Sequence, residues 1–363
     1  MMPNPLRVAF ISRPTLFSVR GGDTVQMEST AQALRELGIE VDILAGYQKV
    51  DYSDYDLLHF FNLIRPANIL YHLKRCNNPF VISPIFVDYS YFQRYDKKGW
   101  RSLPGKILSK WTMEYLKVLA RYIVNKEPIG SAEYLLIGHK AAMQKILSRS
   151  GHILPNSYSE MSRLNKEFLV RTPYTVVPNA VSLTHSTSGP ASTRDEKLIL
   201  CVARIEGNKN QLNLIRAVKG TDFKLILIGR AAPNHQDYMM QCQAESTNQI
   251  EFLGELPHHL IKEYYLRAKV HAMPSWFETT GLSSLEAAAF GCRLVMGSNG
   301  DEKEYFGEDA FYCDPSSVQS IRDAILLAAE ADESQGLKQK IHNEYNWPNA
   351  ARKTLEAYRS LST

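Results

Sequence analysis

The sequence predicts an α/β protein with parallel sheets, arranged in two domains. Short apolar and β-branched runs alternate with helical patterns along the 363-residue chain, and this alternation is typical of parallel sheets. At roughly 100–200 residues per domain, the length favours two domains. Residues 182–194 are rich in serine, threonine, glycine and proline. That composition is typical of a connection between domains, so we expect a boundary near residues 185–195.

The first half begins with an expected strand, helix and strand. Residues 7–11 and 41–45 are apolar runs, and residues 24–37 between them carry apolar side chains at helical spacing. Gly38 follows, and glycine commonly ends a helix. Further strands are expected at residues 57–61, 80–85, 152–154 and 174–177.

The second half has the same layout but a different sequence. Strands are expected at residues 198–202, 224–228, 251–253, 270–273 and 293–296. A helix is expected to begin near Gly281 and Leu282, after a turn that contains glycine. The two halves therefore predict two sheets of similar construction.

The composition argues against several classes of protein. A formal net charge of +4 is too small to indicate a nucleic-acid partner, and no recognition motif accompanies the charge. The five cysteines lack the spacing of a metal site and favour reduced thiols in the cytoplasm. No apolar run reaches the ~18 residues of a membrane-spanning helix. Residues 6–12 enter a strand without the layout of a signal peptide, so we expect a cytoplasmic protein.

Residues 91–126 are far more basic than the rest of the chain. They contain nine lysines and arginines but only two acidic residues, with tryptophan and tyrosine interleaved. A solvated pair of helices would explain this composition. The alternative is docking on an anionic membrane surface, which attracts basic residues by ~1 kcal/mol each and places tryptophan and tyrosine at the interface. Docking would make the protein peripheral on the inner face of the membrane.

Glycines and cations that follow two of the expected strands suit a phosphate-containing ligand. Gly21 and Gly22 precede a helix, where the backbone can approach a ligand closely and the first N–H groups are free. The alternative there is a simple turn with a helix cap. Arg204 and Lys209 follow the strand at residues 198–202, and ligands gather at the carboxyl ends of parallel strands. Two such cations suit a diphosphate, although they could instead be solvated loop residues.

Two glutamates flank the expected start of the helix near Gly281. Free N–H groups in its first turn could hold a phosphate. Glu286 could accept hydrogen bonds from ribose hydroxyls, and Glu278 would lie nearer a reacting sugar. Alternatively, one glutamate caps the helix and the other faces solvent.

Glu278 and Glu286, within F-E-T-T-G-L-S-S-L-E, give the chain a resemblance to the retaining GT-B glycosyltransferases of family 4, which carry an E-x7-E motif. Other motifs of the chain resemble that family in the same order: Gly21-Gly22, L-P-N-S at 154–157, P-N-A-V at 178–181, the Arg204 and Lys209 pair, and F-L-G at 252–254. The resemblance implies the GT-B fold, in which two Rossmann-like parallel-sheet domains face a central cleft. Residues 1–185 would form the acceptor domain, with the helix at 346–363 packing back on it, and residues 190–345 the donor domain.

The resemblance also implies a role for each matched residue. Arg204 and Lys209 would neutralise the departing diphosphate in place of a metal ion, so no metal and no cofactor is expected. Glu286 would bind the ribose, the backbone near Leu256 the base, and Gly21 and Gly22 would approach the donor from the first domain. The donor sugar and its phosphate would be held by Glu278 and by the backbone of Thr279, Thr280, Gly281, Leu282 and Ser283.

Two positions depart from the family pattern. Where many relatives carry a histidine and an aspartate, this chain has S-P-I-F-V-D without a histidine. Either Asp88 takes over the contact with the sugar or the acceptor as a catalytic residue, or that role is absent. Thr280 replaces the usual proline and could add a hydroxyl contact.

The implied activity is transfer of a sugar, with retention, from a UDP- or GDP-linked donor to a hydroxyl of a saccharide or lipid-linked acceptor in cell-surface polysaccharide synthesis. The alternatives are a transferase that acts on a small soluble metabolite and a non-catalytic nucleotide-sugar-binding protein with the same fold.

Overall fold

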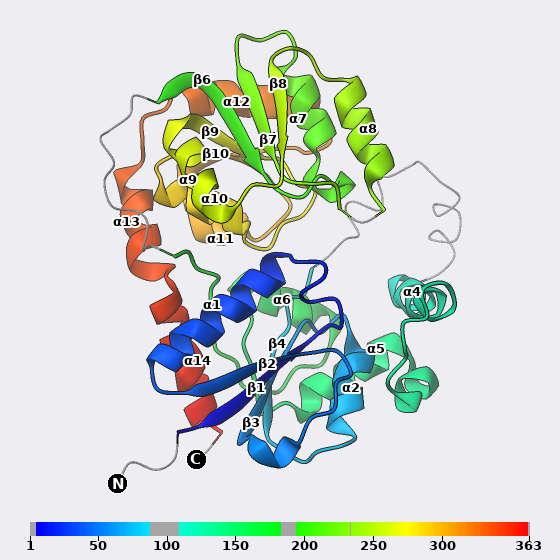
Figure 1. Ribbon diagram of the computed structural model, residues 1–363. Coiled ribbons are helices and arrows are strands. Elements are labelled where there is room, and N and C mark those ends of the chain that lie inside the picture. Colours follow the sequence, from blue (N-terminus) through cyan, green and yellow to red (C-terminus); the bar gives the residue numbers. More distant parts are fainter. Residues whose placement is uncertain (1–4, 88–108, 183–193, 233, 362–363) are drawn as a thin grey trace. The chain divides into compact units, whose positions relative to one another are not determined.

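The computed structural model describes residues 5–87, 109–182, 194–232 and 234–361 (Figure 1). The chain divides into two compact units. Among the described residues, the first unit contains 5–86, 109–179 and 347–361, and the second contains 87, 180–182, 194–232 and 234–346. Residues 183–193 of the expected connection at 182–194 lie outside the described residues.

The first unit is built on a five-stranded parallel sheet with strand order β2-β1-β3-β4-β5. Its strands are β1 (Arg7–Ser12), β2 (Glu40–Ala45), β3 (Leu57–Phe61), β4 (Phe80–Ser83) and β5 (His152–Ile153). The strand expected at 174–177 is wrong: Tyr174 makes only an isolated bridge to Ile153. Pro173 and Pro178 flank that run, and proline cannot donate to a strand ladder.

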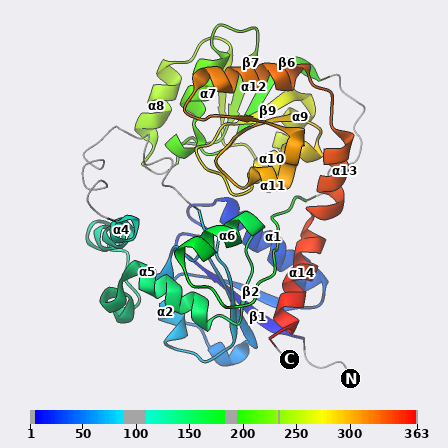
Figure 2. The ribbon, with the colours of Figure 1, turned by 180° about the vertical axis from the view of Figure 1, so that it is seen from behind.

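Helices cover both faces of this sheet because side chains on successive strand residues point to opposite faces (Figure 2). Ala9, Ile11, Leu58 and Phe60 pack with apolar residues of α2 (Pro66–Leu73) and α5 (Ala132–Arg149). On the other face, α1 (Gly22–Glu36) packs against α14 (Trp347–Arg359). The remaining helices are α4 (Lys110–Asn125), α6 (Tyr158–Glu167) and the short 3-10 helix η1 (Tyr52–Asp54).

The last helix, α14, is joined to the sheet of the first unit by a buried hydrogen bond. Nδ1 of His59, on β3, lies 2.7 Å from the hydroxyl of Tyr358, and its Nε2 lies 2.9 Å from Oγ of Ser83. Burial lowers the pKa of His59 to about 3, so the ring is neutral. His59 is therefore a packing residue of the sheet, as its place in an apolar strand predicts.

The second unit has a six-stranded parallel sheet with strand order β11-β10-β9-β6-β7-β8. Its strands are β6 (Asp195–Val202), β7 (Lys224–Ile228), β8 (Ile250–Gly254), β9 (Ala268–Met273), β10 (Arg293–Gly297) and β11 (Ala310–Cys313). The sequence analysis found all of these except β11. That strand lies at the edge of the sheet, where Phe311 and Tyr312 are only partly buried.

Two apolar clusters lie on the two faces of this sheet. One joins alternate strand residues such as Ile199 and Leu227 to α7 (Gln211–Val218), α8 (Gln236–Ala244) and α12 (Val318–Glu330). The other joins residues such as Leu200 and Ile228 to α9 (His258–Arg267), α10 (Leu282–Ala289), α11 (Glu302–Phe306) and α13 (Gln335–Glu344). None of the helices in the described part of the chain is long and apolar enough to span a membrane.

Candidate functional site

The loop after β6 is anchored to the loops that follow β9 and β11. The loop contains the 3-10 helix η4 (Gly207–Lys209) and ends at Asn210, which has a left-handed backbone with φ of 61°. The buried amide of Asn210 donates to the carbonyls of Pro274, at 3.0 Å, and Pro315, at 2.8 Å. The carboxyl ends of β6, β9 and β11 are therefore held together, at the edge where ligands bind in parallel sheets.

Asn208 ties the same loop to the segment that leads into α10. Its carbonyl accepts from the N–H of Trp276 at 2.9 Å, and its side-chain amide donates to the carbonyl of Phe277 at 3.0 Å. These bonds place Lys209 beside Glu278, which is 69 positions away in the sequence.

Lys209 and Glu278 form an ion pair in which both side chains are largely buried. Nζ of Lys209 donates to Oε2 of Glu278, and their side chains are 17% and 14% exposed. Burial alone would lower the pKa of Lys209, but the neighbouring carboxylates of Glu278 and Glu206 outweigh it and raise that pKa. The ammonium is therefore charged and available to a nearby anion.

Arg204 is the more accessible of the two cations that the sequence singles out. Its side chain is 41% exposed, and Nη2 lies 3.5 Å from Oε2 of Glu206. Its backbone carbonyl accepts from the amide of Gln211 at 2.9 Å, which fixes the backbone but leaves the guanidinium with a single long ion pair among the described residues.

The residue that precedes α10 lies close to Glu278, because a Cβ at Gly281 would be 3.4 Å from Cγ of Glu278. Gly281, at φ 68°, is the residue before the helix, and its carbonyl accepts from the N–H groups of Ser284 and Leu285 at 2.8 and 3.0 Å. The N–H groups of Leu282 and Ser283 precede these bonds and have no acceptor within the helix. Thr280 is 1% exposed.

Glu302 is a buried carboxyl beside Glu278 that the sequence analysis missed. It is 1% exposed, and its Oε2 has no hydrogen-bond partner. A Cβ at Gly300 would overlap both Oε2 of Glu302 and the carbonyl oxygen of Glu278, so only glycine fits between them. Burial, followed by the charge of Glu278, raises the pKa of Glu302 well above its ordinary value, which favours the neutral acid.

Both carboxylate oxygens of Glu286 are engaged by side chains from α9. Nε2 of His258 lies 2.7 Å from Oε1, and the hydroxyl of Tyr265 donates to Oε2 at 3.1 Å. The hydrogen bond and charge of Glu286 raise the pKa of His258. His258 and Glu286 are 28 positions apart, so no local sequence pattern indicates this contact.

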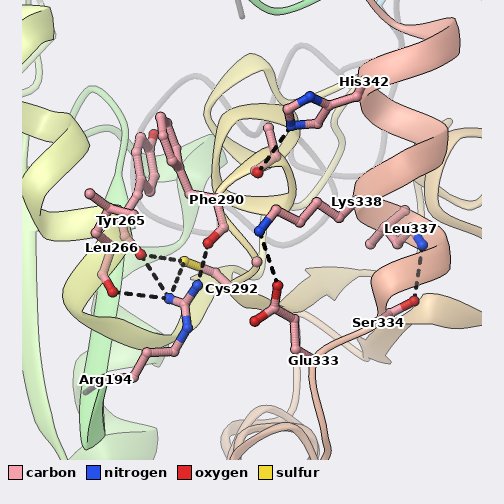
Figure 3. Close-up of polar contacts among 12 residues, drawn as sticks. Arg194, Tyr265, Leu266, Phe290, Cys292, Glu333, Ser334, Leu337, Lys338 and His342 are labelled. Atoms are coloured by element: carbon pink, nitrogen blue, oxygen red, sulfur yellow. Dashed lines mark hydrogen bonds and ion pairs between the residues drawn. The ribbon is translucent and has the colours of Figure 1, made fainter. Parts of the chain in front are cut away.

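Arg194 holds the carboxyl-terminal ends of α9 and α10 together (Figure 3). One guanidinium nitrogen, Nη1, donates to the carbonyls of Tyr265, Leu266 and Ala268 at 3.0, 3.3 and 2.7 Å. The other, Nη2, donates to the carbonyl of Phe290. A cation at two helix ends satisfies carbonyls that lack intrahelical donors and is favoured by the helix dipoles. The helices that carry Tyr265 and Glu286 are thereby fixed relative to each other.

In the first unit, Gly21 and Gly22 begin α1. Gly21 precedes the helix with an extended backbone, and its N–H donates to Oγ1 of Thr24 at 3.3 Å. Asp23 is bound by the guanidinium of Arg13 at 2.6 Å, and a Cβ at Gly21 would lie 3.1 Å from that carboxylate. The helix cap given above as the alternative is present, and glycine leaves room for the partly buried Arg13–Asp23 pair.

The loop after β4 is held by a buried carboxylate of α6. Glu160, which is fully buried, accepts from the N–H groups of Phe86 and Asn156, both at 2.6 Å. Ser157 precedes α6 and caps it by accepting from the N–H of Glu160 at 2.9 Å. These hydrogen bonds give Asn156 and Ser157 of the L-P-N-S segment a structural role at the start of α6. Asp88, two residues beyond Phe86, lies outside the described residues.

Leu256, a candidate for contact with the base, and two aspartates that precede β3 all have structural partners. Leu256 is partly buried against the core of the second unit, so its backbone is the part left for a ligand. Asp56 accepts from the N–H of Arg7 at 2.8 Å, and Asp54 lies 3.7 Å from the Arg7 guanidinium. Across the described ranges, no group of three or more histidine, cysteine or acidic side chains could hold a metal ion.

Comparison with known proteins shows similarity to glycosyltransferases. Residues 188–344 match the family model "Glycosyl transferases group 1". An uncharacterized glycosyltransferase of Methanocaldococcus jannaschii is 28% identical over 178 residues, and the O-antigen chain mannosyltransferase B of Escherichia coli is 27% identical over 176 residues. These alignments span 46% and 45% of this chain and 45% of each relative, so the chain matches about half the length of both.

A longer but weaker similarity covers most of the chain. The N-acetylgalactosamine-N,N'-diacetylbacillosaminyl-diphospho-undecaprenol 4-alpha-N-acetylgalactosaminyltransferase of Campylobacter jejuni is 22% identical over 324 residues, which is 82% of this chain and 83% of that protein.

Solved structures share the fold over nearly the whole chain. Sucrose-phosphate synthase from Thermosynechococcus elongatus has a TM-score of 0.77 at 15% identity and covers 98% of this chain and 99% of its own. Anabaena HepE in complex with UDP-glucose has a TM-score of 0.68 at 14% identity and covers 98% and 100%. The resemblance to glycosyltransferases and the GT-B fold, with two Rossmann-like domains, are thus confirmed.

Proposed function

We propose that the chain is a glycosyltransferase that moves a sugar from a nucleoside diphosphate sugar to a hydroxyl acceptor. The observation that carries the proposal is the Lys209–Glu278 ion pair at the start of α10, with the accessible Arg204 on the same loop as Lys209. Cations and free helix N–H groups suit a diphosphate, and the carboxylate suits sugar hydroxyls. The match of residues 188–344 to group 1 glycosyl transferases supports the same activity.

Groups of the second unit hold the donor. Arg204 grips two phosphate oxygens with its planar fork, and the N–H groups at the start of α10 bind the remaining ones. Glu278 binds the sugar, Glu286 the ribose, and the backbone at Leu256 the base. The donor is a UDP- or GDP-sugar, a choice that the UDP-glucose complex of HepE supports for UDP.

The charges at the proposed diphosphate site balance only if Glu302 is neutral. Arg204 and Lys209 are offset by Glu206 and Glu278, the carboxylates that lie closest to them. An ionised Glu302 would add a further negative charge next to Glu278, whereas its raised pKa favours the neutral form. The neutral acid therefore keeps the site from repelling a diphosphate.

In the proposed reaction the bond between the anomeric carbon and the diphosphate oxygen breaks, and its electron pair moves to the diphosphate. Arg204 and Lys209 then face more negative charge than in the ground state, so they stabilise the transition state preferentially. The acceptor oxygen bonds to the anomeric carbon on the face that the diphosphate leaves, which retains the configuration. The acceptor proton passes to the departing phosphate oxygen. The two cations supply the positive charge, so the reaction needs no metal and no cofactor.

The acceptor is a saccharide or a lipid-linked saccharide used in surface polysaccharide synthesis. Support comes from the relatives, which include an O-antigen chain mannosyltransferase and an enzyme named for a diphospho-undecaprenol-linked substrate. A cytoplasmic enzyme with this acceptor would work at the inner face of the membrane.

Residues 109–126 are the part of the basic segment that the structure describes, and they include α4. Their contacts bear on how the segment would dock on a membrane. Trp111 packs inward, with its ring stacked on Phe86 at a centroid distance of 6.5 Å. Lys117 pairs with Glu114 at 2.6 Å, which reduces the free charge of α4. The end of α4 instead exposes apolar side chains: Ile123 is 74% and Val124 77% exposed. We therefore propose apolar contact at this end of α4 in addition to attraction by the basic residues.

A thermal-shift screen with UDP, GDP, dTDP and ADP tests the proposed donor site. A ligand at 100 times its Kd stabilises a protein by ~2.7 kcal/mol, and we expect UDP or GDP to do so and Arg204→Ala to keep most of the shift. Failure of all four nucleotides would contradict the proposal. Release of the nucleoside diphosphate from a sugar donor without acceptor separates an enzyme from a non-catalytic binder. Transfer to short sugar alcohols rather than to saccharides would favour a soluble metabolite as acceptor.

A further inference from the structure

Glu286 is held in two different ways by its two partners. Tyr265 is 1% exposed, so its hydroxyl cannot leave Oε2 without opening the core of the second unit. The side chain of His258 is 68% exposed, so the imidazole that contacts Oε1 can rotate into solvent. One oxygen of the carboxylate is thus fixed, whereas the other is covered by a residue that can move.

His258 also lies where a nucleotide would enter. It is the first residue of α9 and follows Leu256 and Pro257 directly, in the segment whose backbone is proposed to contact the base. Exposed ion pairs are worth only about 0–1 kcal/mol, so a ligand can displace His258 at little cost. Displacing the hydroxyl of Tyr265 in the same way would leave a buried polar group unpaired and would cost more free energy.

We propose that His258 is a displaceable partner of Glu286, which orients the empty ribose site and gives up its place to the ribose hydroxyls when a nucleotide binds. The inference rests on the proposed function, because it assigns Glu286 to the ribose. His258 is a positioning residue in this account, and the donor hydroxyls replace its N–H at Oε1.

Displacement couples nucleotide binding to a proton. In the free protein, Glu286 raises the pKa of His258. When hydroxyl groups take Oε1, the imidazole loses that partner, its pKa falls towards its ordinary value, and a proton is released. Binding is therefore weaker at low pH and strengthens as the pH rises through the raised pKa. Each unit by which the pKa falls corresponds to about a tenfold change in affinity between the two limits.

The other charged groups near His258 do not offer it a competing carboxylate. Glu255, in the preceding loop, pairs with Arg230 at 3.2 Å. Lys262, one turn along α9, lies over the ring of Phe290. Burial raises the pKa of Tyr265 well above its ordinary value, so its hydroxyl stays neutral. On α10 the only charged residue is Glu286 itself.

Calorimetric titration in two buffers of different ionisation enthalpy measures the protons released on binding. The probe is whichever of UDP, GDP, dTDP and ADP raises the melting temperature most. The proteins are wild type, His258→Gln, which keeps a hydrogen-bond donor without a titrating group, and His259→Gln, a control at the adjacent exposed residue. The terminal phosphate also titrates near pH 6, but it contributes equally to all three proteins.

We expect wild type and His259→Gln to release more protons than His258→Gln at pH 7. The affinity of wild type relative to His258→Gln should rise severalfold from pH 6 to pH 8. Equal proton release by wild type and His258→Gln would overturn the coupling while leaving the proposed function intact. A tenfold loss of affinity in His258→Gln at every pH would also overturn it, because His258 would then bind the nucleotide directly. If no nucleotide binds to wild type, the proposed function fails and this inference with it.

Discussion

Removing Lys209 should destabilise the protein far more than removing an exposed lysine. In Lys209→Met the largely buried Glu278, 14% exposed, keeps its charge but loses its partner. Breaking a buried ion pair by removing one member costs about 3–5 kcal/mol, and the remaining exposure places this pair near the lower end. The expected loss is therefore about 3 kcal/mol.

A double-mutant cycle distinguishes this loss from general damage. Glu278→Gln removes the charge that Lys209 leaves unpaired, so the double variant should be about 1–3 kcal/mol more stable than the sum of the two single effects. The matched control is the Lys197–Asp222 pair, with an N–O distance of 2.9 Å but side chains 58% and 84% exposed. Lys197→Met should cost no more than about 1 kcal/mol.

Urea denaturation of the four proteins and the control, followed by tryptophan fluorescence, measures these differences. Additive effects of Lys209→Met and Glu278→Gln would contradict this reasoning, because the two charges would then not stabilise each other. A loss of stability in Lys209→Met as small as that in Lys197→Met would also contradict it.

Three further predictions concern other parts of the account. Glu302 should be protonated in the folded protein but ionised in the unfolded chain above pH ~4.3. The free energy of unfolding should therefore fall as the pH rises above ~4.3. Glu302→Gln should flatten this pH dependence in urea denaturation and be more stable than wild type at pH 8. The same pH dependence of stability in Glu302→Gln as in wild type would contradict a neutral Glu302. Asp88→Ala should impair transfer but leave nucleotide affinity nearly intact, and normal transfer kinetics would return Asp88 to a structural role. The protein should sediment with anionic vesicles, be released by salt, and bind less after Ile123→Ser and Val124→Ser; equal binding to neutral vesicles would rule this out.

Elements whose local pattern agrees with their tertiary environment were predictable from the sequence. Residues 57–61 and 224–228 form strands over the predicted ranges, because continuous apolar runs are buried on both faces of a parallel sheet. The start of α10 was also predictable, since glycine marks the left-handed residue that precedes it.

Errors arose where flanking prolines or a position at the sheet edge decides the structure. Residues 174–177 have strand composition, but prolines on both sides leave them a single bridge. β11 is short and lies at a sheet edge, so its pattern is weak.

The candidate site was predictable as a set of residues but not as an arrangement. The order of motifs indicates Arg204, Lys209, Glu278 and Glu286, but the Lys209–Glu278 pair depends on how Asn208 and Asn210 join the loops. Glu302 lies in an acidic run that is typical of a solvated surface, and only the packing around Gly300 buries it.

Single-turnover release of nucleoside diphosphate from UDP- and GDP-sugars measures whether Arg204 stabilises the departing diphosphate without a metal ion. Wild type and Arg204→Ala are compared, each with and without EDTA. Loss of one preorganised positive group typically costs ~10²–10³ in rate, so Arg204→Ala should slow release by that factor while donor affinity changes much less. EDTA should leave the wild-type rate unchanged. Equal rates in wild type and Arg204→Ala, or wild-type activity abolished by EDTA and restored by Mg²⁺, would contradict the account.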